Sequence, residues 1–222
     1  MSIDCGSSQT TSYKDTLGVE WAPDVSIWPD IDRLTSTANV TPPAADSSTK
    51  YQTLRYFLPP TASMPTRMNP TKFCYTLPAI GDAQYYLIRA SFWYGASTNT
   101  TLYNTRKPGV VSFRIIIDTI TGPQIDINLP QTSPLIEEMY IWMETVGLLV
   151  PVCFSAASND SGSPFVNSLE LRPLPDSFSP KVGSFAVRTV GRVDLGASTD
   201  SQPIIRYFCP KQHKTATLLI VS

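Results

Sequence analysis

Charged residues are scarce in this sequence, and their scarcity excludes several classes of protein. Asp, Glu, Lys and Arg make up 16% of its 222 residues, below the roughly 25% usual in soluble domains, and the formal net charge is −1. The basic excess that typically accompanies nucleic-acid binding is therefore missing. No apolar run approaches the roughly 20 residues that span a bilayer. Because hydrophobic residues still reach 42%, the chain has enough apolar side chains for a folded core.

The histidine and cysteine content argues against a metal centre. The sequence holds one histidine, His213, and four cysteines without any C-x-x-C spacing, at positions 5, 74, 153 and 209. An even number of cysteines allows disulfides, and four cysteines permit three connectivities. We expect no metal ion and no other cofactor.

Motifs of catalysis are absent as well. The sequence has no glycine-rich phosphate loop, no H-R-D and no D-F-G, which excludes a kinase domain, and no G-x-S-x-G of a serine hydrolase. A glycosidase needs only two well-placed carboxylates, for which Asp118, Asp126, Glu137 and Glu138 are candidates. We interpret these four as solvent-facing residues of strand ends and turns, and we expect no enzymatic activity.

Short β-rich segments separated by Gly, Pro, Ser and Asn dominate what is present. We expect strands over residues 53–58, 73–77, 84–94, 111–117, 124–129, 135–142, 147–154 and 165–171. Both faces of segment 84–94 are largely apolar, which indicates a central strand covered on both sides. A Gly122-Pro123 turn is expected before residue 124. Segment 135–142 favours a strand over a helix because Ile, Tyr and Trp dominate it.

This rhythm predicts an all-β fold, a β-sandwich or jelly roll, over residues 1–176. The first fifty residues are expected to form a long structured loop. Residues 177–222 lose the rhythm and are expected to form an irregular tail, whose apolar end, Leu218–Val221, is too short for a transmembrane helix or a lipid-anchor signal. No signal peptide is expected either, because Ser2–Gly6 follows Met1 directly.

Three N-x-S/T sequons lie in loop-like stretches, at Asn39, Asn99 and Asn159. Together with the cysteines they favour a glycoprotein of an oxidising, extracellular compartment.

An ordered set of short motifs between residues 3 and 174 resembles the plant malectin-like domain. The motifs are Ile3-Asp-Cys-Gly6, Gly18-Val-Glu-Trp21 with Asp24, Thr53-Leu-Arg55, Cys74-Tyr-Thr-Leu77, Tyr86-Leu-Ile-Arg-Ala-Ser-Phe92 with Tyr94-Gly95, Val152-Cys153 and Ser163-Pro-Phe-Val-Asn-Ser-Leu-Glu-Leu-Arg-Pro-Leu174. The resemblance implies a malectin-like, lectin-type β-sandwich of the kind found in ectodomains of plant receptor-like kinases, and hence an extracellular or plasma-membrane location.

Many plant members of this family carry two such units in tandem. The stretch from Val193 to Tyr207 resembles the entry to a second unit. The resemblance therefore implies that residues 177–222 are a linker and the truncated start of a second malectin-like unit.

The resemblance also implies a recognition module that binds a cell-wall oligosaccharide or a secreted peptide, with a possible co-receptor. Loops at one edge of the sandwich form the ligand cleft in such folds. Here Trp93, Tyr94 and Tyr103 flank the 95–108 loop, and Asp160 lies in a later loop, so these four are candidate ligand-binding residues. The alternative for Trp93 and Tyr94 is a place in the core at a strand end. Alternative functions are protein interaction without sugar affinity, or a non-functional receptor fragment.

Several charged residues fall within apolar segments. Arg55 and Arg89 each need a carboxylate partner if buried, for which Asp24 or Asp4 could serve. Glu170 and Arg172 share one face of the last strand and are interpreted as a surface charge pair, with Leu169 and Leu171 facing the core.

Three of the four cysteines lie in family-like motifs. At most two among Cys5, Cys74 and Cys153 can pair with each other. Cys209 lies outside the motifs and is expected to be a free thiol.

Overall fold

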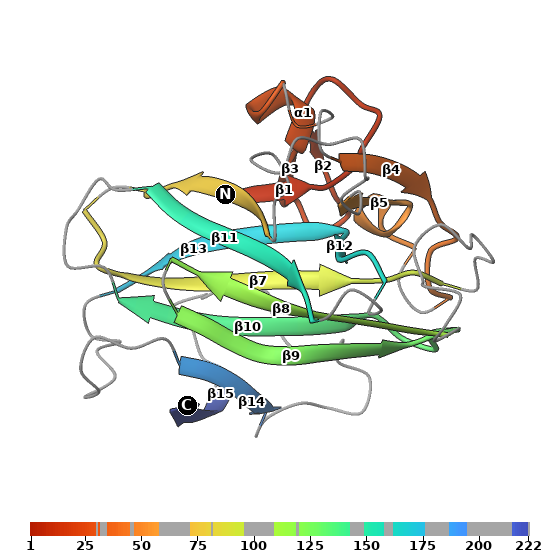
Figure 1. Ribbon diagram of the computed structural model, residues 1–222. Helices are drawn as coiled ribbons and strands as arrows, with labels where there is room; N and C mark the ends of the chain where they lie inside the picture. Colours follow the sequence, from red (N-terminus) through yellow and green to blue (C-terminus); the bar gives the residue numbers. More distant parts are fainter. Residues whose placement is uncertain are drawn as a thin grey trace, which may run out of the picture.

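Two stacked β-sheets form the body of the protein, and a third, smaller sheet lies at one end of the stack (Figure 1). The computed structural model describes residues 1–29, 31, 35–44, 47–57, 72–80, 82–95, 109–118, 120–142, 149–157, 162–175, 187–194 and 215–221, the last two segments by their backbone alone. The arrangement confirms the all-β sandwich that the turn-separated strands predict.

The larger sheet has eight strands, which run across the sheet in the order β15 (Thr215–Val221), β14 (Val187–Asp194), β10 (Leu135–Trp142), β7 (Tyr85–Phe92), β13 (Ser168–Leu174), β1 (Ser2–Asp4), β3 (Glu20–Pro23) and β2 (Tyr13–Lys14). Strand β7 pairs antiparallel with β10 on one side and with β13 on the other. This position confirms the central strand that its two apolar faces indicate.

The facing sheet has four strands, in the order β6 (Phe73–Pro78), β11 (Leu149–Ala156), β8 (Val110–Ile117) and β9 (Ile120–Asn128). The third sheet has three strands, in the order β12 (Phe165–Val166), β5 (Thr53–Phe57) and β4 (Thr35–Asn39). Two short helices, α1 (Asp24–Ile27) and η2 (Thr49–Tyr51), lie among the N-terminal strands.

Aromatic side chains from different strands meet in the core between the sheets. Phe92, Phe113, Phe154 and Phe165 are almost fully buried. Ring centroids of neighbouring pairs among them lie 5.2 to 6.3 Å apart, mostly edge to face. Such pairs contribute about 1 kcal/mol each beyond the burial of their area. Phe92, at the end of β7, therefore contacts the facing sheet through Phe113 and Phe154 and contacts β12 through Phe165.

The expected Gly122-Pro123 turn is wrong. Both residues lie inside β9, and Asp118, at a φ of 54°, lies in the connection from β8. The register shifts opposite them, between Arg114 and Ile116. A Cβ at Gly122 would come within 2.8 Å of the Ile115 carbonyl oxygen, so the close approach of the two backbones requires glycine here. Proline is tolerated because β9 is an edge strand in the described part of the chain.

The expected loop over the first fifty residues is also only partly right. It contains β1, β2, β3 and β4, of two to five residues each. Three of them extend the eight-stranded sheet. These strands are too short to show a sequence periodicity, and β1 depends on β13, far along the chain, for its antiparallel partner.

The expected irregular tail contains strands too. β14 and β15 pair with each other, and β14 pairs with β10 at Met139 and Tyr140. Within the described residues, no helix has the length and apolar character needed to cross a membrane.

Candidate functional site

The strand end after β7 carries two of the predicted ligand-binding residues. Trp93 is 6% exposed, and its indole Nε1 donates a hydrogen bond to the Thr41 carbonyl oxygen at 2.7 Å. Tyr94 is fully buried, and its ring lies 5.8 Å from that of Phe165. The structure therefore places both aromatic rings in the core at a strand end, which is the alternative that the sequence left open. Neither ring presents a face on which a sugar could stack.

Two amide side chains hold this strand end, and sequence reasoning missed both. Asn167, which is fully buried, accepts a hydrogen bond from the Trp93 N–H at 2.6 Å and donates one to the Thr53 carbonyl at 2.8 Å. Gln131 accepts from the Tyr94 N–H at 2.6 Å and donates to the Phe92 carbonyl at 3.2 Å. The available signal was Asn167 itself, a polar amide within the apolar run 165–171, which must find partners when buried.

Beside Gln131 lies a pocket of about 250 Å³. It is formed by the end of β9, the β9–β10 connection and the start of β10, and its lining residues are Asp126, Ile127, Asn128, Pro130, Gln131, Thr132, Ser133 and Leu135. These described residues offer amide, hydroxyl and carboxylate groups, and none of them carries an aromatic ring. Such a surface can form hydrogen bonds with a peptide backbone or with hydroxyl groups. We take this pocket and the adjoining end of β7 as the candidate recognition site.

Several predicted residues cannot be placed at this site. Tyr103, Asp160, Asn99, Asn159 and Cys209 lie outside the described residues. Asn39 ends β4 and is exposed, as a glycosylated residue must be, and its modification stays a prediction.

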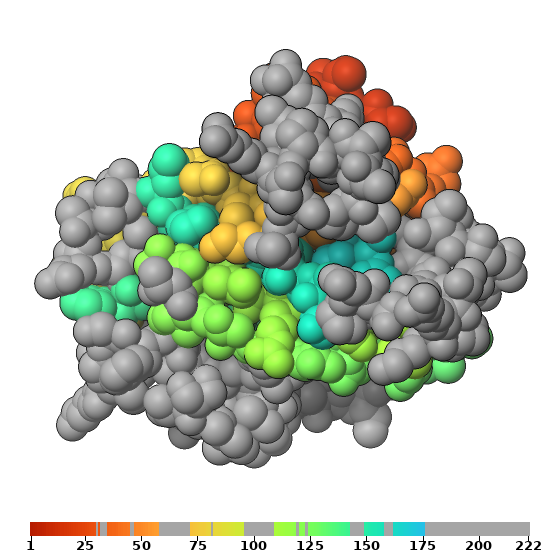
Figure 2. Space-filling model, in the orientation of Figure 1, coloured from red at the N-terminus to blue at the C-terminus, as the bar shows by residue number. Residues whose placement is uncertain are grey.

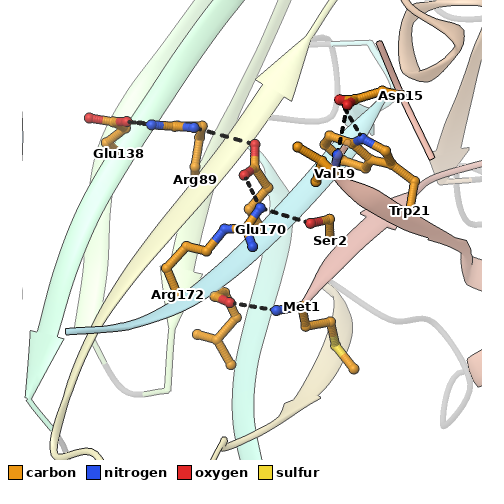
Figure 3. Close-up of polar contacts among 10 residues, drawn as sticks. Met1, Ser2, Asp15, Val19, Trp21, Arg89, Glu138, Glu170 and Arg172 are labelled. Carbon is orange, nitrogen blue, oxygen red and sulfur yellow. Dashed lines mark hydrogen bonds and ion pairs between the residues drawn. The ribbon is translucent and has the colours of Figure 1, made fainter. Parts of the chain in front are cut away.

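A buried line of charges crosses three strands of the large sheet (Figure 3). Arg89 of β7 contacts Glu138 of β10 at 2.6 Å and Glu170 of β13 at 3.4 Å. Glu170 also accepts a hydrogen bond from Arg172 at 2.9 Å, and Arg172 in turn donates to Ser2 of β1. The predicted surface pair is therefore wrong, because Glu170 is 1% exposed. The core positions of Leu169 and Leu171 are confirmed.

The solvent-facing interpretation of Glu137 and Glu138 is also wrong. Their exposed fractions are 5% and 8%. Glu138 serves as the partner of Arg89, a role for which the sequence suggested only Asp4 or Asp24. Asp118 and Asp126 are exposed, as expected.

The electrostatics of this line explain why burial is tolerated. Burial opposes the charge on Arg89, but the carboxylates of Glu170 and Glu138 outweigh it and raise the pKa of Arg89 above its usual value. Burial likewise opposes ionisation of Glu170, but the charges of Arg89 and Arg172 hold the pKa of Glu170 below its usual value. The line is thus a structural ion-pair network.

Arg55 has the carboxylate partner that its apolar strand requires. Asp24 accepts from Arg55 Nε at 2.6 Å and from Nη2 at 3.0 Å, and both side chains are fully buried. The Gly6 N–H and the Tyr75 hydroxyl also donate to Asp24. Gly6 has a φ of 81°, and a Cβ there would lie 2.5 Å from the Leu54 carbonyl oxygen, so only glycine fits.

Two of the three motif cysteines pair with each other and the third does not, as the sequence allows. Cys74 and Cys153 form a disulfide between β6 and β11, where they are paired in register. Cys5 is buried with a free thiol, and burial raises its pKa well above the usual value, so it is not a reactive thiolate. Among the residues that the structure describes, no cluster of His, Cys, Asp and Glu could hold a metal ion.

Comparison with known proteins identifies the family. The chain belongs to the malectin-like domain family, whose sequence profile matches residues 3–212. A probable LRR receptor-like serine/threonine-protein kinase of Arabidopsis thaliana is 26% identical to this chain over 200 residues. That match covers 89% of this chain and 18% of the relative, so the chain spans less than a fifth of the relative's length.

Solved ectodomains of plant receptor kinases share the fold. The ANX1 ectodomain from Arabidopsis thaliana has a TM-score of 0.60 at 16% identity, covering 89% of this chain and 50% of that one. The structure of the plant peptide RALF23 in complex with FER and LLG2 has a TM-score of 0.58 at 18% identity, covering 87% and 48%. At these identities the likeness establishes the fold. The chain spans about half the length of those solved chains.

Proposed function

We propose that this chain is a non-enzymatic recognition module of a receptor-like kinase and that its ligand is a secreted peptide. The family match and the solved receptor ectodomains support the receptor context. One neighbouring structure is itself a complex that contains the plant peptide RALF23. The proteins FER and LLG2 in the same complex make a co-receptor part of the proposal.

The burial of Trp93 and Tyr94 is the observation that favours a peptide over a carbohydrate. Lectin sites commonly offer an aromatic face to a sugar ring, yet both predicted rings are buried in the core, and the Trp93 indole also donates a hydrogen bond to a backbone carbonyl. The candidate recognition site instead presents short polar side chains at the end of an edge strand of the described sheets. Extended peptides are recognised by such surfaces through main-chain hydrogen bonds.

A cell-wall carbohydrate remains the second candidate, on one specific observation. Asp126, Asn128 and Gln131 place a carboxylate and two amides around one pocket, and such groups can bind sugar hydroxyls. The volume of about 250 Å³ is below the usual range for a small-molecule site, which makes this candidate the weaker one.

The test compares the two ligand classes on one folded protein. Residues 1–222 are secreted behind a heterologous signal peptide, immobilised, and exposed to a plant cell-wall glycan array and to a phage-displayed library of random peptides. We expect enriched peptides that bind in the presence of excess oligosaccharide, and a blank array. A reproducible glycan signal without peptide enrichment would show that the ligand is a carbohydrate and contradict the peptide proposal. A folded protein that binds neither would refute the proposed recognition role.

A further inference from the structure

Strand β9 lies at the edge of the four-stranded sheet, and its free side borders the candidate recognition site. In the part of the chain that the structure describes, β9 pairs only with β8. The pocket is lined by residues of β9, of the β9–β10 connection and of β10, and by none of β8. It therefore lies on the side of β9 that faces away from its own sheet. Figure 2 shows residues of β8 and β9, in yellow-green, at the surface turned to the viewer.

The hydrogen-bond register tells which backbone groups of β9 point to that side. The Leu129 N–H donates to the Gly109 carbonyl at 2.7 Å. In an antiparallel pair the bonded positions alternate, so Ile127 and Ile125 face Val111 and Phe113 as bonded pairs. The backbone N–H and C=O groups of Gln124, Asp126 and Asn128 consequently point away from β8. The carbonyl of Ser112, which lies opposite Asp126, accepts a hydrogen bond from the N–H of Ala157, the residue that follows β11. This carbonyl therefore points away from β9, which agrees with the alternation.

The side chains of this segment alternate in the same way. Ile125 and Ile127 are buried in the core, which fixes the strand against the sheet, while Gln124, Asp126 and Asn128 are exposed. The bulge and the Gly122-Pro123 pair end the regular edge at residue 123. A regular edge of five residues, 124–128, thus lies at the surface next to the pocket.

We propose, as a deepening of the proposed function on which it rests, that an extended segment of the secreted peptide adds as a strand to the β9 edge. Its main chain hydrogen-bonds to the outward groups of Gln124 and Asn128, and one of its side chains enters the pocket. Among the described residues, the pocket lining holds a carboxylate, Asp126, and no cationic group, so it favours a lysine or arginine side chain. Strand addition of this kind gives affinity through the backbone and specificity through the pocket.

Backbone amide exchange of the secreted chain is the direct test, with a synthetic peptide recovered from the phage library as the probe. We expect the amides of Gln124 and Asn128 to exchange more slowly when the peptide is added. Peptide binding that protects other segments and leaves β9 unchanged would overturn the β9 site, although peptide recognition itself would stand. Slow exchange of the β9 amides without peptide, together with a dimer in light scattering, would show that a second copy of the chain pairs with this edge. That result would also overturn the proposed peptide site.

The peptide affinity of two variants tests the same β9 site. Asn128→Pro removes one outward N–H without removing a hydrogen bond to β8, and we expect about a 10-fold weaker affinity, the effect of losing one backbone hydrogen bond in a peptide ladder. Asp126→Lys should lower the affinity for basic peptides by a similar factor. The matched control is Glu20→Lys, which reverses an exposed carboxylate on β3. Equal affinities for Asp126→Lys, Glu20→Lys and the unmodified chain would exclude the pocket, and thermal unfolding of each variant shows that it is folded.

Discussion

Asp24 is a buried carboxylate around which four separate segments meet. It accepts hydrogen bonds from Gly6 after β1, from Arg55 of β5 and from Tyr75 of β6, and it begins α1 itself. The Arg55 guanidinium also donates to the Thr35 hydroxyl of β4 at 2.9 Å. Because each donor comes from a different element, removing one partner leaves several polar atoms in the core without hydrogen bonds.

We predict that Arg55→Ala destabilises the protein severely. The substitution leaves the Asp24 charge buried without its partner, which costs about 3–5 kcal/mol in free energy of unfolding. Chemical denaturation measures the loss. Arg114→Ala is the control, because Arg114 is exposed on β8 and its removal should change the free energy by about 0.5 kcal/mol or less. Equal losses in the two variants would contradict the role given to the Asp24 pair.

Asp4 gives a prediction of pH dependence. It is fully buried, and burial raises its pKa to about 7 despite a hydrogen bond from the Tyr13 hydroxyl. In the unfolded chain its pKa is about 4. Between these values the folded state binds more protons than the unfolded state, so the contribution of Asp4 to stability falls as the pH rises from about 4 to about 7.

Comparison with Asp4→Asn isolates this contribution, because the variant cannot titrate. We expect the free energy of unfolding of the unmodified protein, minus that of the variant, to decrease across this pH range by up to about 1.4 kcal/mol per pH unit. Denaturant titrations at several pH values provide the measurement. A flat difference would show that Asp4 titrates alike in both states.

At the scale of elements, periodicity predicted the strands that have apolar faces and missed those defined by distant partners. Segments 53–58, 73–77 and 135–142 match β5, β6 and β10 closely, because most side chains on a buried strand are apolar. The two-residue β2 and the three-residue β1 carry no period. The candidate recognition site was missed for a related reason: its polar residues belong to an edge strand and a turn, where composition resembles that of any loop.

The disulfide is an element-scale constraint, since it joins the edge strand β6 to β11. Cys74 and Cys153 are 79 residues apart in sequence, and the closure of a loop of that length stabilises a fold by about 4 kcal/mol in the chain-entropy description. We therefore predict that a reducing agent lowers the melting temperature by about 10 °C. Differential scanning calorimetry with and without dithiothreitol measures the shift.

Two variants separate the disulfide from other thiol effects. A protein with both Cys74→Ala and Cys153→Ala should melt at the lower temperature and ignore the reductant. Cys5→Ala should keep the sensitivity to reductant, because Cys5 has a free thiol. A melting temperature of the unmodified protein that does not respond to reduction would show that the bridge adds no stability.

At the scale of the whole molecule, the side chains that the structure describes form one large core, and a second, small cluster consists of Leu87, Tyr140 and Leu174. The buried members of the large core come from both large sheets and from the three-stranded sheet, and in the described part of the chain they run from Ile3 to Leu171. The described contact of β14 with this body consists of two register pairs, Met139 with Arg188 and Tyr140 with Val187. The sequence-based division at residue 176 is thus compatible with where the core side chains lie, and it stays a prediction that folding can test.

We predict that residues 1–175 fold without the remainder of the chain. Because the large core cluster of the described residues lies within them, unfolding in denaturant should be cooperative, and tryptophan fluorescence and far-ultraviolet circular dichroism should give coincident transitions. The loss of the β14 pairing should cost only a few kcal/mol. A chain that ends at residue 157 is the control: it lacks β13, which lies between β7 and β1, so the large sheet cannot form. If residues 1–175 gave no cooperative transition while residues 1–222 did, the segment beyond 175 would be part of the folding unit.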